Sequence, residues 1–284
     1  MKRLFLVLLA FSSLIACSPI ALINNRVSPR NFIGTRNVAY GSLERQKLDV
    51  YQPRKGANLP VLIFVHGGSW RNGSKEIYPF FGERFALEGF VTLIINYRLA
   101  PETPFPGFVQ DAALAVKWAK DNVQKFAGDP NRVFLAGHSA GAHIVAMLAL
   151  NPAYLKAVNL ERSAVRGVVG MAGPYDIAEF FPQSPSLQQV FGTDPKAWAA
   201  TQPLNFVDGT NPPMLLQHGM RDSTVDYRQS IMLQEKILAK SGQVELKTYP
   251  KLEHEELIGA VSLAAEASLD KNVVPDIVSF LKRH

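Results

Sequence analysis

The stretch Val-Phe-Leu-Ala-Gly-His-Ser-Ala-Gly, residues 133–141, leads from an apolar run into a helical pattern. Residues 133–136 are all apolar, as expected of a buried strand, and residues 142–147 continue with the pattern of a buried helix. The pentapeptide between them therefore predicts a sharp strand-to-helix turn that carries Ser139. Its two glycines fit this prediction, because so tight a backbone leaves no room for a Cβ on either side. Such a turn lifts the serine hydroxyl clear of the sheet edge, where a neighbouring base can reach it.

Length and composition favour one globular domain. The chain has 284 residues, of which 47% are hydrophobic, and α/β folds reach this size without splitting. The net charge of +6 comes from scattered basic residues, without the basic stripe or interleaved aromatics of a nucleic-acid surface. We therefore expect no nucleic-acid partner. Cys17 is the only cysteine, which excludes an intrachain disulfide and a cysteine metal cluster.

The first residues have the layout of an export signal. Lys2 and Arg3 precede an apolar run over residues 4–11, as in a secretory signal peptide. Leu-Ile-Ala-Cys at 14–17 resembles the lipobox of bacterial lipoproteins, in which the cysteine is acylated and becomes the first mature residue. The resemblance implies a signal peptide over 1–16 and a membrane anchor of acyl chains on Cys17.

Residues 17–35 hold few periodic apolar positions and are expected to form a tether. Ser18 lacks the aspartate that retains such lipoproteins at the inner membrane, so the resemblance implies the periplasmic face of the outer membrane in a Gram-negative organism. The alternatives are an uncleaved N-terminal anchor or a plain secretory signal in which Cys17 has no role. The apolar stretch is short for a membrane span of ~20 residues.

From about residue 36, strand-like and helix-like patterns alternate. The expected strands are 47–51, 61–65, 91–95, 132–136, 167–171, 213–217 and 244–249, the first of them at an edge of the sheet. Long helices are expected within 106–127 and 226–240. This alternation predicts a mostly parallel sheet flanked by helices on both faces. Residues 174–211, with prolines, aromatics and short helical pieces, are expected to form part of a cap or substrate wall. Phe80 and Phe81 are further candidates for such a wall.

A glycine-containing turn follows the strand expected at 61–65. It reads His-Gly-Gly-Ser-Trp over residues 66–70. The backbone N–H groups of Gly67 and Gly68, with that of Ala140, are predicted to form an oxyanion hole for a tetrahedral intermediate. We expect His66 to orient this loop by a hydrogen bond rather than to act as a base. A tight turn without a ligand role is the alternative.

The candidate base is His254, which follows the last expected strand. His218 is the alternative, whereas His143 lies one helical turn past Ser139 and His284 is the last residue. His254 is favoured because an acid at a strand end, Asp222, lies between it and Ser139. Such a carboxylate holds the imidazole tautomer and stabilises the imidazolium. The other acids considered are Asp226, which we expect to cap a helix, and Asp208, Glu253 and Asp176.

The chain resembles the esterase branch of the α/β-hydrolases that includes hormone-sensitive-lipase-like carboxylesterases, feruloyl-esterase-like enzymes and kynurenine formamidases. The resemblance rests on residues 66–70, Asn-Tyr-Arg-Leu at 96–99, Gly-Asp-Pro at 128–130, residues 137–141, and His218-Gly219 with Asp222. It implies an α/β-hydrolase domain over 36–284. It also implies Ser139, Asp222 and His254 as the catalytic triad, with Gly67, Gly68 and Ala140 as oxyanion donors.

Ser69 departs from the third glycine of the hormone-sensitive-lipase-like members, and Trp70 is closer to the formamidase and feruloyl-esterase pattern. We therefore expect a serine carboxylesterase that cleaves small acyl or aryl esters through an acyl-enzyme on Ser139, without metal or cofactor. An arylformamidase acting on N-formylkynurenine-like substrates is an alternative, although an exported location argues against it. A non-catalytic binding protein on a hydrolase scaffold is the third hypothesis. Tyr97 and Arg98 line the site in one interpretation and are structural in the other.

Overall fold

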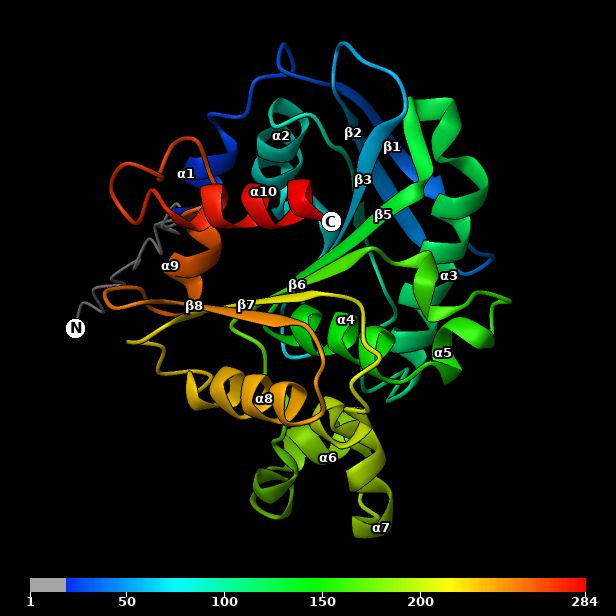
Figure 1. Cartoon of the computed structure of the whole chain (residues 1–284), viewed down its shortest axis with the longest axis vertical. Coiled ribbons are helices and arrows are strands. Elements are labelled where there is room, and N and C mark those ends of the chain that lie inside the picture. The colour runs from blue at the N-terminus through cyan, green and yellow to red at the C-terminus, as the bar shows by residue number, and fades with distance from the viewer. Residues whose placement is uncertain (1–18) are drawn as a thin grey trace, which may run out of the picture.

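A computed structural model describes residues 19–284 of the chain, so the predicted signal peptide and Cys17 lie outside the described residues. One eight-stranded sheet forms the centre of the molecule (Figure 1). In spatial order its strands are β1 (Ile33–Ala39), β2 (Lys47–Gln52), β4 (Val91–Ile95), β3 (Leu59–Val65), β5 (Gly128–His138), β6 (Gly167–Met171), β7 (Met214–Gly219) and β8 (Val244–Tyr249). The strands from β4 to β8 run parallel, whereas β1–β2 and β2–β4 pair antiparallel. The α/β-hydrolase fold with a mostly parallel sheet is confirmed.

Helices cover both faces of this sheet, as predicted. On one face lie α2 (Pro79–Leu87), α9 (His254–Gly259) and α10 (Val273–Arg283), and on the other lie α3 (Gly107–Asn122), α4 (Ala140–Leu150) and α8 (Arg228–Ala239). The shorter helices are α1 (Pro19–Asn24), α5 (Ala153–Lys156), α6 (Pro185–Phe191) and α7 (Pro195–Trp198). Single 3₁₀ turns occur at Lys75–Ile77, Val123–Phe126, Arg162–Ala164, Ala178–Gln183, Ala199–Thr201 and Pro203–Phe206. Within residues 19–284, no helix combines the length and apolar character needed to cross a bilayer.

The central strands separate two hydrophobic clusters. Along β3, Val61, Ile63 and Val65 pack on the side of α3 and α4, whereas Leu62 and Phe64 pack on the side of α2 and α10. This alternation explains why the sequence of β3 is apolar at successive positions, since both faces of a central parallel strand are buried. Helix α4 is buried along its whole length. Because α4 is enclosed on all sides, its packing fixes the position of the turn at Ser139 from which it begins.

The N-terminal edge of the sheet differs from the prediction. The strand predicted at 47–51 is β2, and it is not the edge, because β1 pairs with its outer side. Side chains of β1 are mostly exposed and the pairing contains a register shift, so the strand has no run of buried apolar positions from which to recognise it. The predicted boundary of the domain at residue 36 therefore lies inside a strand.

The tether predicted over 17–35 is wrong for its described part. Phe32 is buried in the core. The Ser28 N–H and the Asn31 side chain donate hydrogen bonds to the Glu83 carboxylate of α2, at 2.7 and 2.8 Å. The Asn24 side chain donates to the Ile77 carbonyl at 2.9 Å. These contacts make the segment before β1 part of the folded body.

A buried carboxylate on α3 holds the segment that follows β4. Asp111 is fully buried and accepts hydrogen bonds from the Arg98 guanidinium at 2.8 to 3.0 Å and from the Arg98 N–H at 2.8 Å. The Gln46 side chain donates to the same carboxylate at 2.7 Å. Arg98 is therefore structural.

Replacing Asp111 by alanine is expected to lower the free energy of unfolding by about 1–3 kcal/mol, because it leaves the buried Gln46 amide and the partly buried Arg98 guanidinium without their acceptor. The matched control is Asp121→Ala on the same helix, where Asp121 pairs with Lys117 at the surface and the expected change is below about 1 kcal/mol. Urea denaturation of both variants measures the difference. Equal losses in the two variants would contradict this account.

Candidate active site

Ser139 occupies the turn between β5 and α4 in a strained backbone conformation. Its φ is 56° and its ψ is −121°, a conformation that costs a residue other than glycine about 1–3 kcal/mol. A Cβ on Gly141 would lie 2.0 Å from the Val65 carbonyl oxygen, and one on Gly137 would lie 2.3 Å from the Gly141 carbonyl oxygen. The predicted sharp turn and the steric reason for its glycines are therefore confirmed.

Asp222 and His254 lie together at the ends of β7 and β8. His254 is the first residue of α9, and its Nδ1 donates to Asp222 Oδ2 at 2.7 Å. The other carboxylate oxygen accepts the N–H groups of Thr224 and Val225 at 2.9 and 2.8 Å. Burial raises the pKa of Asp222, but hydrogen bonds from His218, His254 and the Val225 N–H outweigh burial and hold this pKa well below its usual range. Asp222 is therefore ionised beside an imidazole whose Nδ1 carries the proton.

The alternative base, His218, is buried in the core beside Asp222 and binds other partners. Its ring is fully buried, with Nδ1 2.7 Å from the Ser230 hydroxyl and Nε2 2.9 Å from the Val225 carbonyl oxygen. The same Nε2 lies 3.2 Å from Asp222 Oδ2. His218 is thus a second donor to the carboxylate that His254 uses. Its spacing of four residues from Asp222 was the only sequence signal of this contact.

The alternative acids bind other partners. Asp226 pairs with Arg228, and Asp208 pairs with Arg162. The Glu253 side chain caps α9. Among residues 19–284, Asp222 is the carboxylate that hydrogen-bonds to His254.

His138 links the serine turn to the start of α9. Its Nε2 lies 3.1 Å from the His254 carbonyl oxygen, and the two imidazole rings are 4.7 Å apart between centroids. Burial, with the nearby His254 second, lowers the pKa of His138 to about 3, so this ring is neutral and donates from Nε2. The residue immediately before Ser139 thereby holds the backbone of His254. Sequence reasoning did not assign this role to His138.

The glycine loop after β3 lies against the serine turn. A Cβ on Gly67 would lie 3.1 Å from the Ser139 Cβ. Gly68, Ser69 and Trp70 all have positive φ, at 119°, 53° and 58°. Such backbone conformations occur in tight turns, where successive N–H groups can form a concave anion site.

Ser69 is a further candidate for an oxyanion donor beside the predicted Gly67 and Gly68. Gly67 lies against Ser139, and its backbone opposes the rise in the pKa of Tyr78 that burial causes. Ser69, one residue beyond Gly68, lines the same cavity as Ser139. The assignment of Gly67 and Gly68 as the loop's donors stays a prediction, and Ser69 is an additional candidate.

The rings of His66 and Tyr97 fix the position of the glycine loop at residues 66–70 through hydrogen bonds. His66 Nδ1 donates to the Gly67 carbonyl at 2.7 Å, which confirms the expectation that His66 orients the loop. The Tyr97 hydroxyl donates to the His66 carbonyl at 3.0 Å, so Tyr97 is also structural. Burial lowers the pKa of His66 to about 4, which keeps its ring neutral.

His143 connects the loop to the segment predicted to form a cap. The Trp70 indole N–H donates to His143 Nδ1 at 3.3 Å, and His143 Nε2 donates to the Thr201 carbonyl at 2.8 Å. Burial lowers the pKa of His143 to about 4, so the ring is neutral and can accept at one nitrogen while it donates at the other. Sequence reasoning missed this role, because each partner lies far from His143 in the chain.

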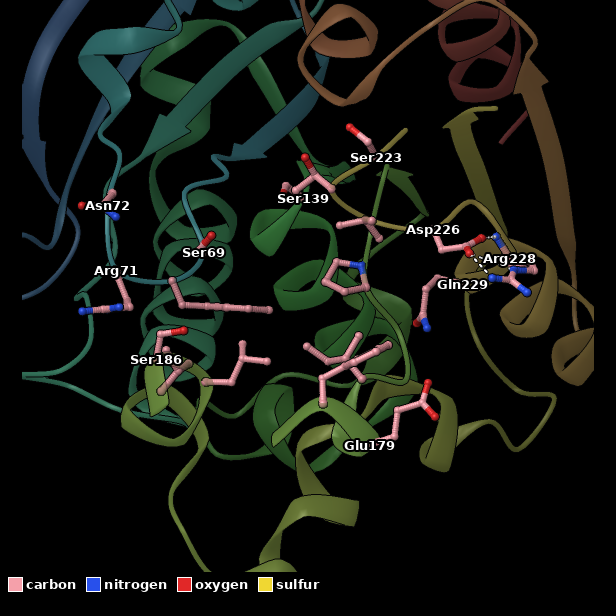
Figure 2. A pocket seen from close by; sticks show the side chains of 18 of the residues that line it. Ser69, Arg71, Asn72, Ser139, Glu179, Ser186, Ser223, Asp226, Arg228 and Gln229 are labelled. Carbon is pink, nitrogen blue, oxygen red and sulfur yellow. Dashed lines mark hydrogen bonds and ion pairs between the residues drawn. The ribbon is translucent and has the colours of Figure 1, made fainter. Parts of the chain in front are cut away.

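A cavity of about 780 Å³ opens at Ser139 (Figure 2). The predicted wall over 174–211 is confirmed, because part of this segment lines the cavity. Its residues at the cavity are Pro174, Ile177, Glu179, Phe180, Ser186, Leu187 and Val190. Residues 69–72 form one side, and the loop from Ser223 to Asp226 lies beside Ser139. The prediction for Phe80 and Phe81 is wrong, since both are buried in the core on the α2 face of the sheet.

The three neutral histidines give an expected pH dependence of stability. His66, His138 and His143 have pKa values of about 4, 3 and 4, below the ordinary value of 6.5, so the unfolded chain binds more protons than the folded chain in acid. The free energy of unfolding should be highest above pH 6.5 and should fall as the pH falls toward about 4. Urea denaturation across this range measures the effect, and His143→Gln should make the dependence shallower. A wild-type stability that is constant over the range would contradict the assignment.

Comparison with known proteins places the chain in a family. The protein family described as BD-FAE matches residues 48–237 of the chain. The esterase LipC of Mycobacterium tuberculosis is 36% identical over 75% of this chain and 57% of its own length. The isoprenylcysteine alpha-carbonyl methylesterase ICME of Arabidopsis thaliana is 27% identical over 78% of this chain and 56% of its own length. The chain thus spans little more than half of each of these relatives.

Solved structures share the fold at low sequence identity. A truncated carbohydrate esterase from gut microbiota superposes with a TM-score of 0.78 at 23% identity, covering 90% of this chain and 98% of that one. Esterase B from Lactobacillus rhamnosis gives a TM-score of 0.77 at 21% identity, covering 93% and 90%. Because the family match extends over most of the sheet and both sides of the serine turn, the chain belongs to the BD-FAE family of α/β-hydrolase proteins.

Proposed function

We propose that the chain is a serine carboxylesterase that cleaves small acyl or aryl esters through an acyl-enzyme on Ser139. The observation that carries the proposal is the 2.7 Å hydrogen bond between His254 Nδ1 and Asp222, at the same sheet edge as the strained serine turn. With Nδ1 donating to an ionised carboxylate, Nε2 is left as the basic nitrogen of the ring. Ser139, Asp222 and His254 then act as nucleophile, acid and base.

The reaction follows from these roles. His254 Nε2 removes the Ser139 proton as Oγ attacks the ester carbonyl, and the N–H groups of Gly67, Gly68 and Ala140 stabilise the oxyanion. The imidazolium returns the proton to the leaving alcohol as the tetrahedral intermediate breaks down. Water, deprotonated by His254, then attacks the acyl-enzyme and releases the carboxylic acid and the serine. The reaction requires no metal or organic cofactor.

The cavity supports a small ester as substrate. Its volume of about 780 Å³ falls in the usual range for small-molecule sites, and apolar side chains such as Trp70, Leu187 and Val190 alternate with hydroxyls along its walls. The relatives described above are named as esterases, which favours an ester over the formamide of the alternative hypothesis. Rates on butyrate or feruloyl esters against N-formylkynurenine compare the two directly.

Replacing Ser139 by alanine should lower kcat by roughly 10⁶-fold, and Asp222→Asn should lower it by roughly 10⁴-fold, because the asparagine no longer holds the required imidazole tautomer. Hydrolysis of p-nitrophenyl acetate, with its acyl-enzyme burst, and labelling by a fluorophosphonate probe are the two measurements. Asp208→Asn removes a surface carboxylate that pairs with Arg162 and should retain activity. Full turnover by the Ser139 variant would refute the proposal.

We also propose that the chain is exported and anchored to a bacterial membrane, most simply the outer membrane, by acyl chains on Cys17. The lipobox resemblance over residues 14–17 supports this assignment. Two or more acyl chains give stable anchoring where a single chain is marginal.

Replacing Cys17 by serine should move the protein from the membrane fraction to the soluble fraction of the producing cells and abolish metabolic labelling with palmitate, because no thiol remains for acylation. Ser18→Ala is the matched control and should remain in the membrane fraction. Membrane retention of the Cys17 variant would instead identify an uncleaved anchor.

A further inference from the structure

Four charged side chains line the cavity at Ser139, and one of them differs from the rest. Arg228 is bound to Asp226, as the dashed lines in Figure 2 show, and Glu179 is exposed to solvent. Arg71 is only partly exposed and forms no ion pair with a carboxylate in the described part of the chain. Its Nε is buried and has no hydrogen-bond partner among the described residues. Arg71 thus places a positive charge without a carboxylate partner in the wall of the cavity.

The backbone around Arg71 is fixed. The N–H groups of Arg71 and Asn72 both donate to the Gly68 carbonyl, at 3.0 and 2.9 Å. The Ala100 N–H donates to the Trp70 carbonyl at 2.9 Å, and the Arg45 guanidinium donates to the Gly73 carbonyl at 3.0 Å. Arg71 is therefore held three residues after Gly68, on the loop that faces Ser139.

A guanidinium in this position is suited to an anionic ligand. Neither Nη group of Arg71 is hydrogen-bonded to a described residue, and the side chain is partly exposed, so these groups can donate to a ligand. The planar guanidinium fork matches a carboxylate and binds it through two parallel hydrogen bonds. Glu179 lies on the other side of the cavity from Arg71, where Arg228 neutralises Asp226 (Figure 2). The Glu179 carboxylate therefore repels an anion from that side and favours its approach to Arg71.

We propose that Arg71 binds a carboxylate of the substrate, so that the preferred substrates are esters with a carboxylate in the part of the molecule beyond the scissile bond. This inference rests on the proposed esterase function and names its substrate class. The carboxylate belongs either to the acyl group, as in a monoester of a dicarboxylic acid, or to the alcohol, as in a carboxyphenyl ester. In both cases Arg71 is a specificity-determining residue and takes no part in proton transfer.

The test compares kcat/KM within two matched pairs of esters. The acyl pair is the 4-nitrophenyl monoester of adipic acid and its terminal carboxamide. The alcohol pair is 3-carboxyphenyl butyrate and 3-carbamoylphenyl butyrate. At neutral pH both acids are ionised, and the wild-type enzyme should prefer the carboxylate in one pair by roughly 10- to 100-fold.

Three variants identify the contact. Arg71→Gln should bring the preferred ratio close to one, and Arg71→Lys should retain part of it, because lysine keeps the charge without the fork. Arg228→Gln changes the charge of the cavity wall by the same amount but should leave the ratio largely intact, since Arg228 is already paired.

Two results would overturn the inference. One is a wild-type ratio near one in both pairs, and the other is an equal fall in the ratio for Arg71→Gln and Arg228→Gln, which would indicate the general field of the cavity. The carboxamide esters and p-nitrophenyl acetate report the proposed function separately. If none of them is cleaved, the esterase assignment itself fails.

Discussion

The close approach of two backbones at the end of β5 is the constraint on which the site depends. β5 pairs with β3 in register, so that Gly137 lies opposite Val65, and the chain must turn at once into α4 beneath the end of β3. At Gly141 the turn passes so close to the Val65 carbonyl that no side chain fits. The loop that follows β3 therefore emerges directly against Ser139. One steric restriction thus places both the candidate nucleophile and the loop that carries its candidate oxyanion donors.

Buried neutral histidines then fix the parts of the site to one another. His66 holds the loop after β3, His138 holds the backbone of His254, and His143 joins Trp70 to the cap at Thr201. A neutral imidazole suits these places because it offers one donor and one acceptor without the cost of burying a charge. His254 differs from these rings because an ionised carboxylate faces its Nδ1. Of these four rings, only that of His254 has a built-in partner for the imidazolium that a general base becomes.

The polar side chains at the site divide between those already satisfied and those that face the cavity. Asp222 receives hydrogen bonds from two histidines and two backbone N–H groups, so its orientation is over-determined and its charge is stable. Arg71 stands at the opposite extreme, with a buried donor that no described residue satisfies. A carboxylate on the substrate would supply the missing hydrogen-bond acceptor for the Arg71 guanidinium. Asp222 thus has its hydrogen-bond partners within the protein, whereas Arg71 lacks an acceptor that a ligand can supply.

The sequence by itself determined the buried strands and the order of the candidate triad. Strands β4 and β6 have the predicted bounds, because strands buried on both faces are continuous apolar runs. β8 also has the predicted bounds, although it is an edge strand with mostly half-buried or exposed side chains. The pairing of Asp222 with His254 could be predicted because parallel strands bring their carboxyl ends to one edge. Tertiary structure alone revealed β1, the bond from His138 to the His254 carbonyl, the His143 bridge and the unpaired guanidinium of Arg71. An exposed edge strand leaves no apolar pattern, and a hydrogen bond between residues distant in the chain leaves no local signal, since its geometry exists only after the sheet has formed.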